Sequence, residues 1–275
     1  MVKKLVVFDE SWLTGARAKR ALAPSSWAHD VIEALATTGG MYLDTLRQWF
    51  DGFPLNSNKQ KHPLKTRLES FNNEDHLGAV NELAWWVFMQ RIGLQSCPVP
   101  ASSAPRPDFQ VKTSVNFFVE VSTLNTPMSD KSKFETGEGV ALDHTETLRR
   151  ILGKVTDEKQ RQMSYATDQK QPCVLVLFDY TIWSAFGTQF FHFLADFLLG
   201  KEKGFQGLPG TLSALVYVER KVIDGRIAVS RDRSAIYYNP NAKYPLDMGI
   251  FVALNQFWGQ VVAVESKSAD HWIWL

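Results

Sequence analysis

The chain has 275 residues, of which 45% are hydrophobic and 21% charged, and its formal net charge is +1. This composition allows a sizeable core and excludes wholesale disorder, while the near-zero charge argues neither for nor against a polyanionic partner. The first apolar run is too short for a secretory signal and no later run is long enough to cross a membrane, so we expect a cytoplasmic protein with no membrane partner.

The N-terminal part, residues 1–73, is expected to be a helical region packed on an α/β domain formed by residues 74–275. Apolar spacing and alanine-rich segments predict helices within residues 10–52. Residues 53–65 are polar and contain two prolines, so we interpret them as a loop. A basic cluster here could contact phosphates or could simply be solvated: Lys59, Lys61, His62, Lys65 and Arg67.

A long helix is predicted next, at about residues 76–92, with Gly93 as its C-terminal cap. Three extended segments follow, and the last two are close enough along the chain to form a hairpin. Their ranges are 94–100, 108–113 and 117–124.

The second half of the chain continues the alternation of helix and strand. A polar loop, 125–142, leads to a helix at about 143–166, and the apolar run 173–180 is typical of a central strand. A further helix is predicted at 184–199 and a further strand at 212–220.

The order of elements from residue 74 is helix, three strands, helix, strand. This order predicts an α/β fold with a mixed sheet. Residues 74–180 would form its core, and residues 181–275 a C-terminal elaboration with extra short strands. The turn-rich end of segment 236–242 is interpreted as a tight turn that ends a strand.

Three acidic residues occur in apolar surroundings, where packing of a hydrophobic core does not account for a carboxylate. Glu82 lies on an apolar helix and needs a metal, a cation or a donor, unless it reaches water or pairs with an arginine such as Arg91. Asp108 follows a proline at the start of a strand, although a turn aspartate is an alternative. Glu120 lies in the middle of an apolar strand on the same face as Ser122, unless that strand is an edge strand with one wet face.

The helix predicted at 143–166 carries polar side chains within its apolar face. A helical wheel places Lys159 and Gln162 inside that face and Lys154 toward its margin. A lysine directed toward the core either extends its stem along apolar surface to reach water or serves a site.

Together these residues resemble the PD-(D/E)XK nuclease superfamily, which has a restriction-endonuclease-like core. The motif would be a proline and Asp108, eleven further residues, and then Glu120-Val121-Ser122 on the partner strand of the hairpin. Glu82 comes from the preceding helix, as in the superfamily's first helix. The resemblance covers residues 74–180.

The resemblance implies a metal-dependent endonuclease that hydrolyses the phosphodiester bonds of nucleic acid, with DNA favoured over RNA. Mg²⁺, or Mn²⁺ as its substitute, would be bound by Asp108, Glu120 and the backbone carbonyl of Val121. Glu82 would bind through water or hold a second metal ion. Cleavage of both strands of a duplex would favour a homodimer.

One position departs from the superfamily's pattern, because Ser122 stands where a lysine is usual. Lys159 is the first candidate to reach the same space, and Lys154 is the second. Such a lysine would orient or deprotonate the attacking water or stabilise the transition state, and Gln162 could position a water molecule or a phosphate oxygen. The alternative is a catalytically degenerate protein of the same fold that binds nucleic acid or another partner.

Overall fold

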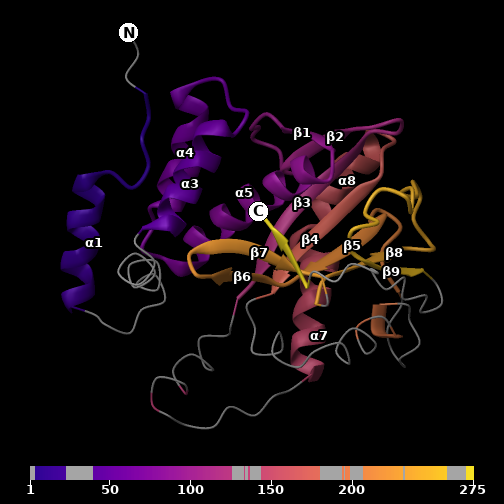
Figure 1. The fold of residues 1–275 in the computed structure, drawn as a ribbon. Coiled ribbons are helices and arrows are strands. Elements are labelled where there is room, and N and C mark those ends of the chain that lie inside the picture. Colours follow the sequence, from indigo (N-terminus) through magenta and orange to yellow (C-terminus); the bar gives the residue numbers. More distant parts are fainter. Residues whose placement is uncertain are drawn as a thin grey trace. The chain divides into compact units, whose positions relative to one another are not determined.

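The fold is known from a computed structural model (Figure 1). The structure describes residues 4–22, 40–125, 133, 136, 144–179, 194, 196–198, 207–231, 233–258 and 271–275. The predicted loop at 125–142 and the predicted helix at 184–199 lie largely outside these residues. Within them, no helix is long and apolar enough to cross a membrane.

The chain divides into two compact units, which are described separately. Unit 1 comprises Met1–Phe88, Lys221–Ala228 and Trp274–Leu275, and unit 2 comprises Met89–Arg220 and Val229–Ile273. The predicted domain boundary after residue 73 stays a prediction.

Helices dominate the N-terminal part of unit 1. The helices predicted within residues 10–52 are confirmed in the described residues, as α1 (Glu10–Leu22) and α3 (Met41–Gly52). One face of α3 carries its buried residues Tyr42, Leu43, Leu46, Trp49 and Phe50. Because these residues recur at helical spacing, their burial stabilises α3 far more than its intrinsic helix propensity does.

The prediction of a loop at residues 53–65 is wrong. Most of this segment belongs to helix α4 (Asn58–Leu68), and the side chain of Ser57 caps it by accepting a backbone hydrogen bond. Two leucines of α4, one turn apart, are buried, while Pro63 lies inside the helix. A proline there removes one backbone hydrogen bond. The cap and the burial of the leucines outweigh that loss, and polar composition alone did not reveal them.

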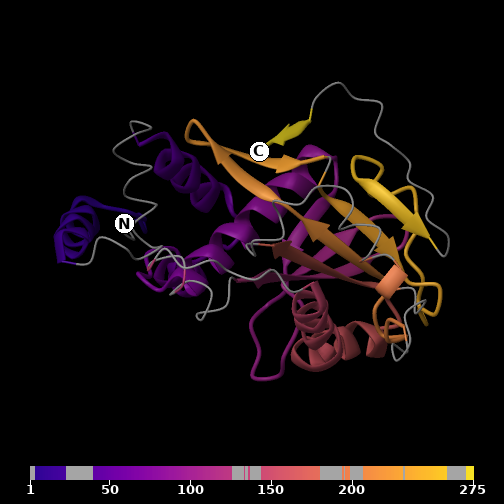
Figure 2. The ribbon, with the colours of Figure 1, turned by 90° about the horizontal axis from the view of Figure 1, so that it is seen from below.

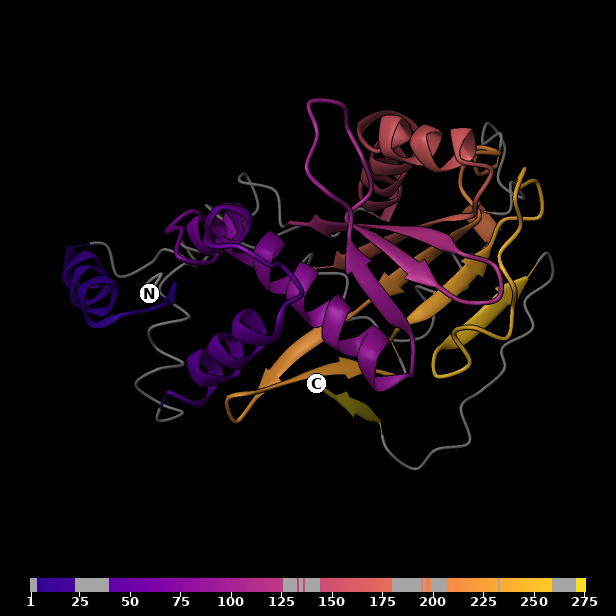
Figure 3. The same ribbon diagram turned by 90° about the horizontal axis from the view of Figure 1, so that it is seen from above.

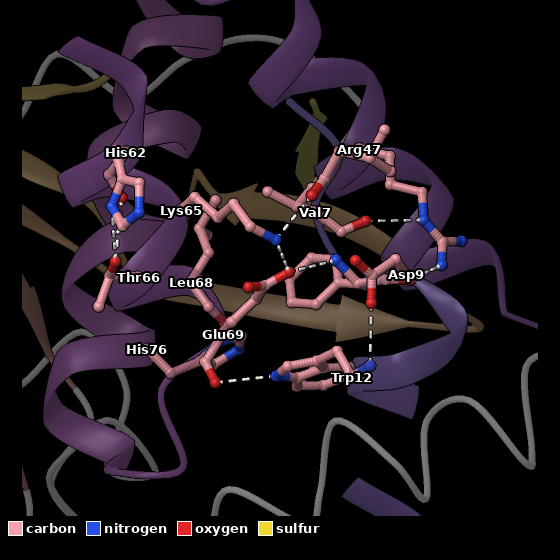
Figure 4. Close-up of polar contacts among 12 residues, drawn as sticks. Val7, Asp9, Trp12, Arg47, His62, Lys65, Thr66, Leu68, Glu69 and His76 are labelled. Carbon is pink, nitrogen blue, oxygen red and sulfur yellow. Dashed lines mark hydrogen bonds and ion pairs between the residues drawn. The ribbon is translucent and has the colours of Figure 1, made fainter. Parts of the chain in front are cut away.

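Side chains of α3 and α4 hold the segment that precedes α1 (Figure 4). Arg47 donates to two backbone carbonyls of residues 6–9, and Lys65 donates to a third at 2.6 Å. Glu69 accepts the backbone N–H of Phe8 at 2.7 Å and forms an ion pair with Lys65. The otherwise unpaired backbone groups of this extended segment are thereby satisfied.

Most of the predicted basic cluster contributes to this packing. Lys61 donates to two carbonyls at the C-terminus of α3, both at 2.9 Å, where the helix dipole favours a cation. Lys65 is engaged as described, and Arg67 forms an ion pair with a carboxylate of the following helix. Phosphate contact by the cluster stays a prediction.

The predicted long helix is confirmed as α5 (Asn73–Arg91). Its C-terminal cap is confirmed too, because Gly93 adopts a φ of 81°. The N–H of Gly93 donates to the carbonyl of Gln90 at 3.1 Å, and that of Leu94 donates to Met89 at 2.8 Å. These two bonds form a Schellman motif, in which a residue without a side chain takes the left-handed conformation at no steric cost.

Unit 2 is built on a mixed seven-stranded sheet of order β1-β2-β3-β4-β5-β8-β9. Its strands are β1 (Gln95–Pro98), β2 (Phe109–Lys112), β3 (Phe117–Leu124), β4 (Cys173–Asp179), β5 (Ala214–Val218), β8 (Ala235–Tyr238) and β9 (Asn255–Trp258). Strands β1, β2 and β3 are antiparallel neighbours, whereas β3, β4 and β5 run parallel. The α/β class with a mixed sheet is therefore confirmed, as are the five strands predicted between residues 94 and 220.

The extra C-terminal strands are also present. Besides β8 and β9, a second sheet has the order β10-β7-β6. Its strands are β6 (Arg220–Ile223), β7 (Arg226–Ser230) and β10 (Trp272–Trp274).

The helix predicted at 143–166 is interrupted. It consists of α7 (His144–Gly153), a π-helical turn (Lys154–Glu158) and α8 (Gln160–Asp168). Together they cover one face of β3 and β4 (Figure 3), with a core that includes Phe118, Ile151, Val155, Met163 and Leu175. A π-turn inserts a residue into the helical repeat, so it shifts the faces of the two helices relative to each other.

Candidate active site

The candidate site begins with Glu120 in the middle of β3. Strand alternation places its side chain on the face that α7 and α8 cover, and only 4% of the residue is exposed. In the register with β4 its neighbour is Leu175, which is fully buried. A carboxylate in such apolar surroundings needs a partner of opposite charge or a metal ion.

Lys159 supplies that partner. Its Nζ lies 2.6 Å from Oε1 of Glu120, and the two side chains are 20% and 5% exposed. Lys159 is the residue between the π-turn and α8, with φ −105° and ψ 3°. The break in the helix therefore directs a lysine to the strand glutamate from 39 residues away in sequence.

The surroundings keep Lys159 charged. Burial by itself lowers the pKa of Lys159, but the Glu120 carboxylate and then the Asp108 carboxylate outweigh it, so that the pKa is raised above the usual 10.5. Lys159 is thus a cation at neutral pH. It is suited to stabilise negative charge and not to remove a proton from water.

Asp108 joins this pair from the start of the hairpin. Its Oδ2 accepts the backbone N–H of Val121 at 2.7 Å, so the carboxylate is fixed beside the residue that follows Glu120. The antiparallel register of β2 and β3, in which Phe109 pairs with Val119, produces this approach. The structure therefore brings together Asp108, Glu120, Val121 and Lys159 from two strands and the start of a helix.

The other predicted residues lie in different settings. Gln162 is one helical turn after Lys159, and its Oε1 is buried without a hydrogen-bond partner in the described part of the chain. Lys154, the second candidate lysine, forms an ion pair with Glu158. Because Lys154 is engaged there, Lys159 is the lysine that contacts the strand glutamate.

Glu82 belongs to unit 1, where it forms an ion pair with Arg67. Its side chain is 14% exposed. The arginine is Arg67 of α4 and not the Arg91 suggested by sequence proximity. A role for Glu82 in metal binding stays a prediction.

A divalent cation in unit 2 would be held by the carboxylates of Asp108 and Glu120. No group of three or more His, Cys, Asp or Glu side chains in the described residues is arranged to hold a metal. Mg²⁺ typically takes one or two carboxylates and keeps several waters, which suits such a pair. The buried Oε1 of Gln162 is an acceptor that a bound water could satisfy.

Comparison of the chain with family models, with curated proteins and with solved structures finds no significant match.

A second polar contact on the sheet was missed from the sequence. The hydroxyl of Tyr217 on β5 donates to Asp179 at the end of β4, and both residues are buried. Burial, and then the Asp179 carboxylate, raise the pKa of Tyr217 well above 10.0, and burial does the same for Tyr237. The sequence feature that could have indicated this contact is Asp179 itself, a charged residue at the end of a continuous apolar strand.

High pH is expected to destabilise the protein through Tyr217 and Tyr237. As the pH rises, each phenol ionises in the unfolded chain while it is still protonated in the folded protein. The contribution of each phenol to the free energy of unfolding is therefore fully present below pH 10.0 and is lost progressively above it. Each phenol should lower the free energy of unfolding by about 1.4 kcal/mol per pH unit. Urea unfolding at alkaline pH measures this slope. Tyr237→Phe should reduce it, and an unchanged slope in that variant would contradict the assignment.

Proposed function

We propose that this chain is a metal-dependent nuclease that hydrolyses the phosphodiester bonds of nucleic acid, with DNA as the expected substrate. The observation that carries the proposal is the ion pair of 2.6 Å between Lys159 and Glu120. This contact supports the idea that Lys159, at the start of α8, takes the place of the motif lysine, because Ser122 occupies that lysine's usual position.

The order and pairing of the elements support a restriction-endonuclease-like core. Strands β1 to β3 form an antiparallel meander, the helices α7 and α8 follow, and β4 then pairs parallel to β3. In such a core the acidic residues come from the hairpin, and here Asp108 directly precedes β2 while Glu120 lies on β3.

Each residue of the site has a chemical task in this proposal. Asp108, Glu120 and the Val121 carbonyl would hold Mg²⁺ or Mn²⁺, which when bound neutralises phosphate charge and lowers the pKa of water. Lys159, whose pKa is raised by the Glu120 and Asp108 carboxylates against the effect of burial, would stabilise negative charge that develops on a phosphate oxygen. Gln162 uses its unpaired Oε1 to orient the attacking water.

A catalytically degenerate nucleic-acid-binding protein of the same fold is the second candidate. Lys159 already compensates the charge of Glu120, so the pair also satisfies the rule that buried charges are paired. On this reading the acidic residues would be structural, and their neutral variants would leave nucleic-acid binding unchanged.

The test is cleavage of duplex DNA and of single-stranded RNA in Mg²⁺, in Mn²⁺ and in EDTA. Asp108→Asn and Glu120→Gln should each reduce cleavage by a factor on the order of 10³, because each removes an anionic ligand but keeps the side chain's size. Asp168→Asn, an exposed aspartate at the far end of α8, is the matched control. Purified wild-type protein that cleaves neither substrate with either metal would overturn the nuclease proposal.

A further inference from the structure

The loop between β1 and β2 carries an arginine close to the candidate site. The two ends of this loop are joined by a hydrogen bond in which the N–H of Val99 donates to the carbonyl of Asp108 at 2.8 Å. Arg106 lies two residues before Asp108 and is exposed. Figures 2 and 3 both show this loop beside the helices α7 and α8.

Arg106 is held against an aromatic ring. Its guanidinium carbon lies 5.3 Å from the centroid of the Tyr165 ring on α8. Tyr165 in turn packs edge to face on Phe118 of β3, with ring centroids 5.4 Å apart. Phe118 lies two residues before Glu120 on the same face of the strand. The position of Arg106 is therefore tied to both strands that carry the acidic residues.

This contact orients the guanidinium without using its hydrogen-bond donors. A cation–π contact is an attraction to the face of the ring and occupies none of the five N–H donors of the guanidinium. In the described part of the chain, Arg106 has no ion pair or hydrogen bond through its side chain. The flanking prolines, Pro105 and Pro107, restrict the backbone, so little backbone entropy is lost when an anion binds.

The charge balance of the site calls for a further cation if a polyanion is to bind there. Asp108 and Glu120 carry two negative charges, and Lys159 offsets one of them. A polyanionic substrate would therefore be repelled unless further cations face it. A planar guanidinium with free donors is the side chain best suited to bind a phosphate through two hydrogen bonds.

We propose that Arg106, held on Tyr165, binds a backbone phosphate of the nucleic acid next to the one that is cleaved. This inference rests on the proposed function for the identity of the ligand. Arg106 touches the substrate's backbone and not its bases, so it contributes affinity without sequence preference.

The experiment measures binding of a short DNA duplex by fluorescence anisotropy in EDTA at several salt concentrations, so that cleavage plays no part. Arg106→Gln should weaken binding about tenfold and should lower the slope of log Kd against log salt by about 0.9, the value for one phosphate contact. Arg106→Lys keeps the charge and should retain the slope.

Arg91→Gln is the matched control. Arg91 is exposed at the end of α5 and precedes β1, whose first residue pairs with Lys112 at the end of β2 away from Asp108. Its removal should change neither affinity nor slope.

The outcomes separate this inference from the proposed function. If Arg106→Gln and Arg91→Gln bind alike, the inference is overturned even when the wild type cleaves DNA. If only Arg106→Gln loses affinity and slope, the inference is supported, and cleavage by the wild type is judged separately. A wild type that does not bind the duplex overturns the inference whatever its metal affinity.

Discussion

Lys159→Met is expected to reduce metal-dependent cleavage by a factor of about 10²–10³, the usual effect of removing one group that stabilises transition-state charge. The affinity for Mn²⁺ should be equal or higher in this variant, because Lys159 no longer competes for Oε1 of Glu120, which it contacts at 2.6 Å. Single-turnover cleavage measures the first effect, and electron paramagnetic resonance of bound Mn²⁺ measures the second.

A second substitution at Ser122 makes this result specific. Ser122 is buried on the same face as Glu120, at the position where the superfamily motif usually has lysine. The double variant Ser122→Lys with Lys159→Met should regain at least about tenfold of the lost activity, since a cation returns to the same carboxylate. Lys154→Met, which removes the lysine paired with Glu158, is the control and should retain activity.

One result would contradict the role of Lys159 in stabilising the transition state. If Lys159→Met cleaves as fast as the wild type while Glu120→Gln is inactive, the lysine is only the structural partner of a buried carboxylate. Thermal unfolding in EDTA should accompany both assays, because removal of one member of a buried ion pair costs about 3 kcal/mol.

Asn239→Asp is expected to lower the free energy of unfolding by about 4 kcal/mol, the largest effect we expect for a single polar substitution in this chain. The buried Asn239 amide donates to the carbonyls of Pro209 and Leu212 at 2.9 and 2.7 Å, and its Oδ1 accepts the N–H of Asn241 at 2.9 Å. A carboxylate removes both donated bonds and places negative charge against two carbonyl oxygens. Urea unfolding at neutral pH measures the change.

The neighbouring Asn241 provides the control. Asn241 is exposed and donates its hydrogen bond through its backbone N–H, so Asn241→Asp should change the free energy of unfolding by less than about 0.5 kcal/mol. A loss of stability in Asn239→Asp no larger than that of Asn241→Asp would show that the network around Asn239 does not support the fold.

This network also gives segment 236–242 a structural role. The expected turn at the end of a strand is confirmed, since β8 ends at Tyr238 and Ala242 donates to the carbonyl of Asn239 at 3.2 Å. The side chain of Asn239 does more than initiate that turn, because it also holds the loop that leads into β5. The pattern of turn residues predicted the turn, but it contained no sign of the partners some 30 residues earlier.

The π-turn is the feature that makes the candidate site possible. A helical wheel for one continuous helix placed Lys159 within the apolar face, and the structure does bring its Nζ to Glu120. Lys159 nevertheless lies at the junction of two helices and not inside one. Local propensities do not distinguish an α-helix from one with an inserted residue, because the choice depends on packing against the sheet.

Local patterns in the sequence correctly predict the strands of the α/β unit, the hairpin and the helix α5 with its Gly93 cap. These features depend on alternation, on apolar runs and on single residues with special backbone preferences, all of which are local. The sequence also singled out Asp108, Glu120 and Lys159 as residues in unusual surroundings. The three-dimensional fold was needed to show that Lys159 pairs with Glu120, that the N–H of Val121 binds Asp108, and that α4 is a helix. Those contacts arise from strand register and from burial, which join residues far apart in the chain.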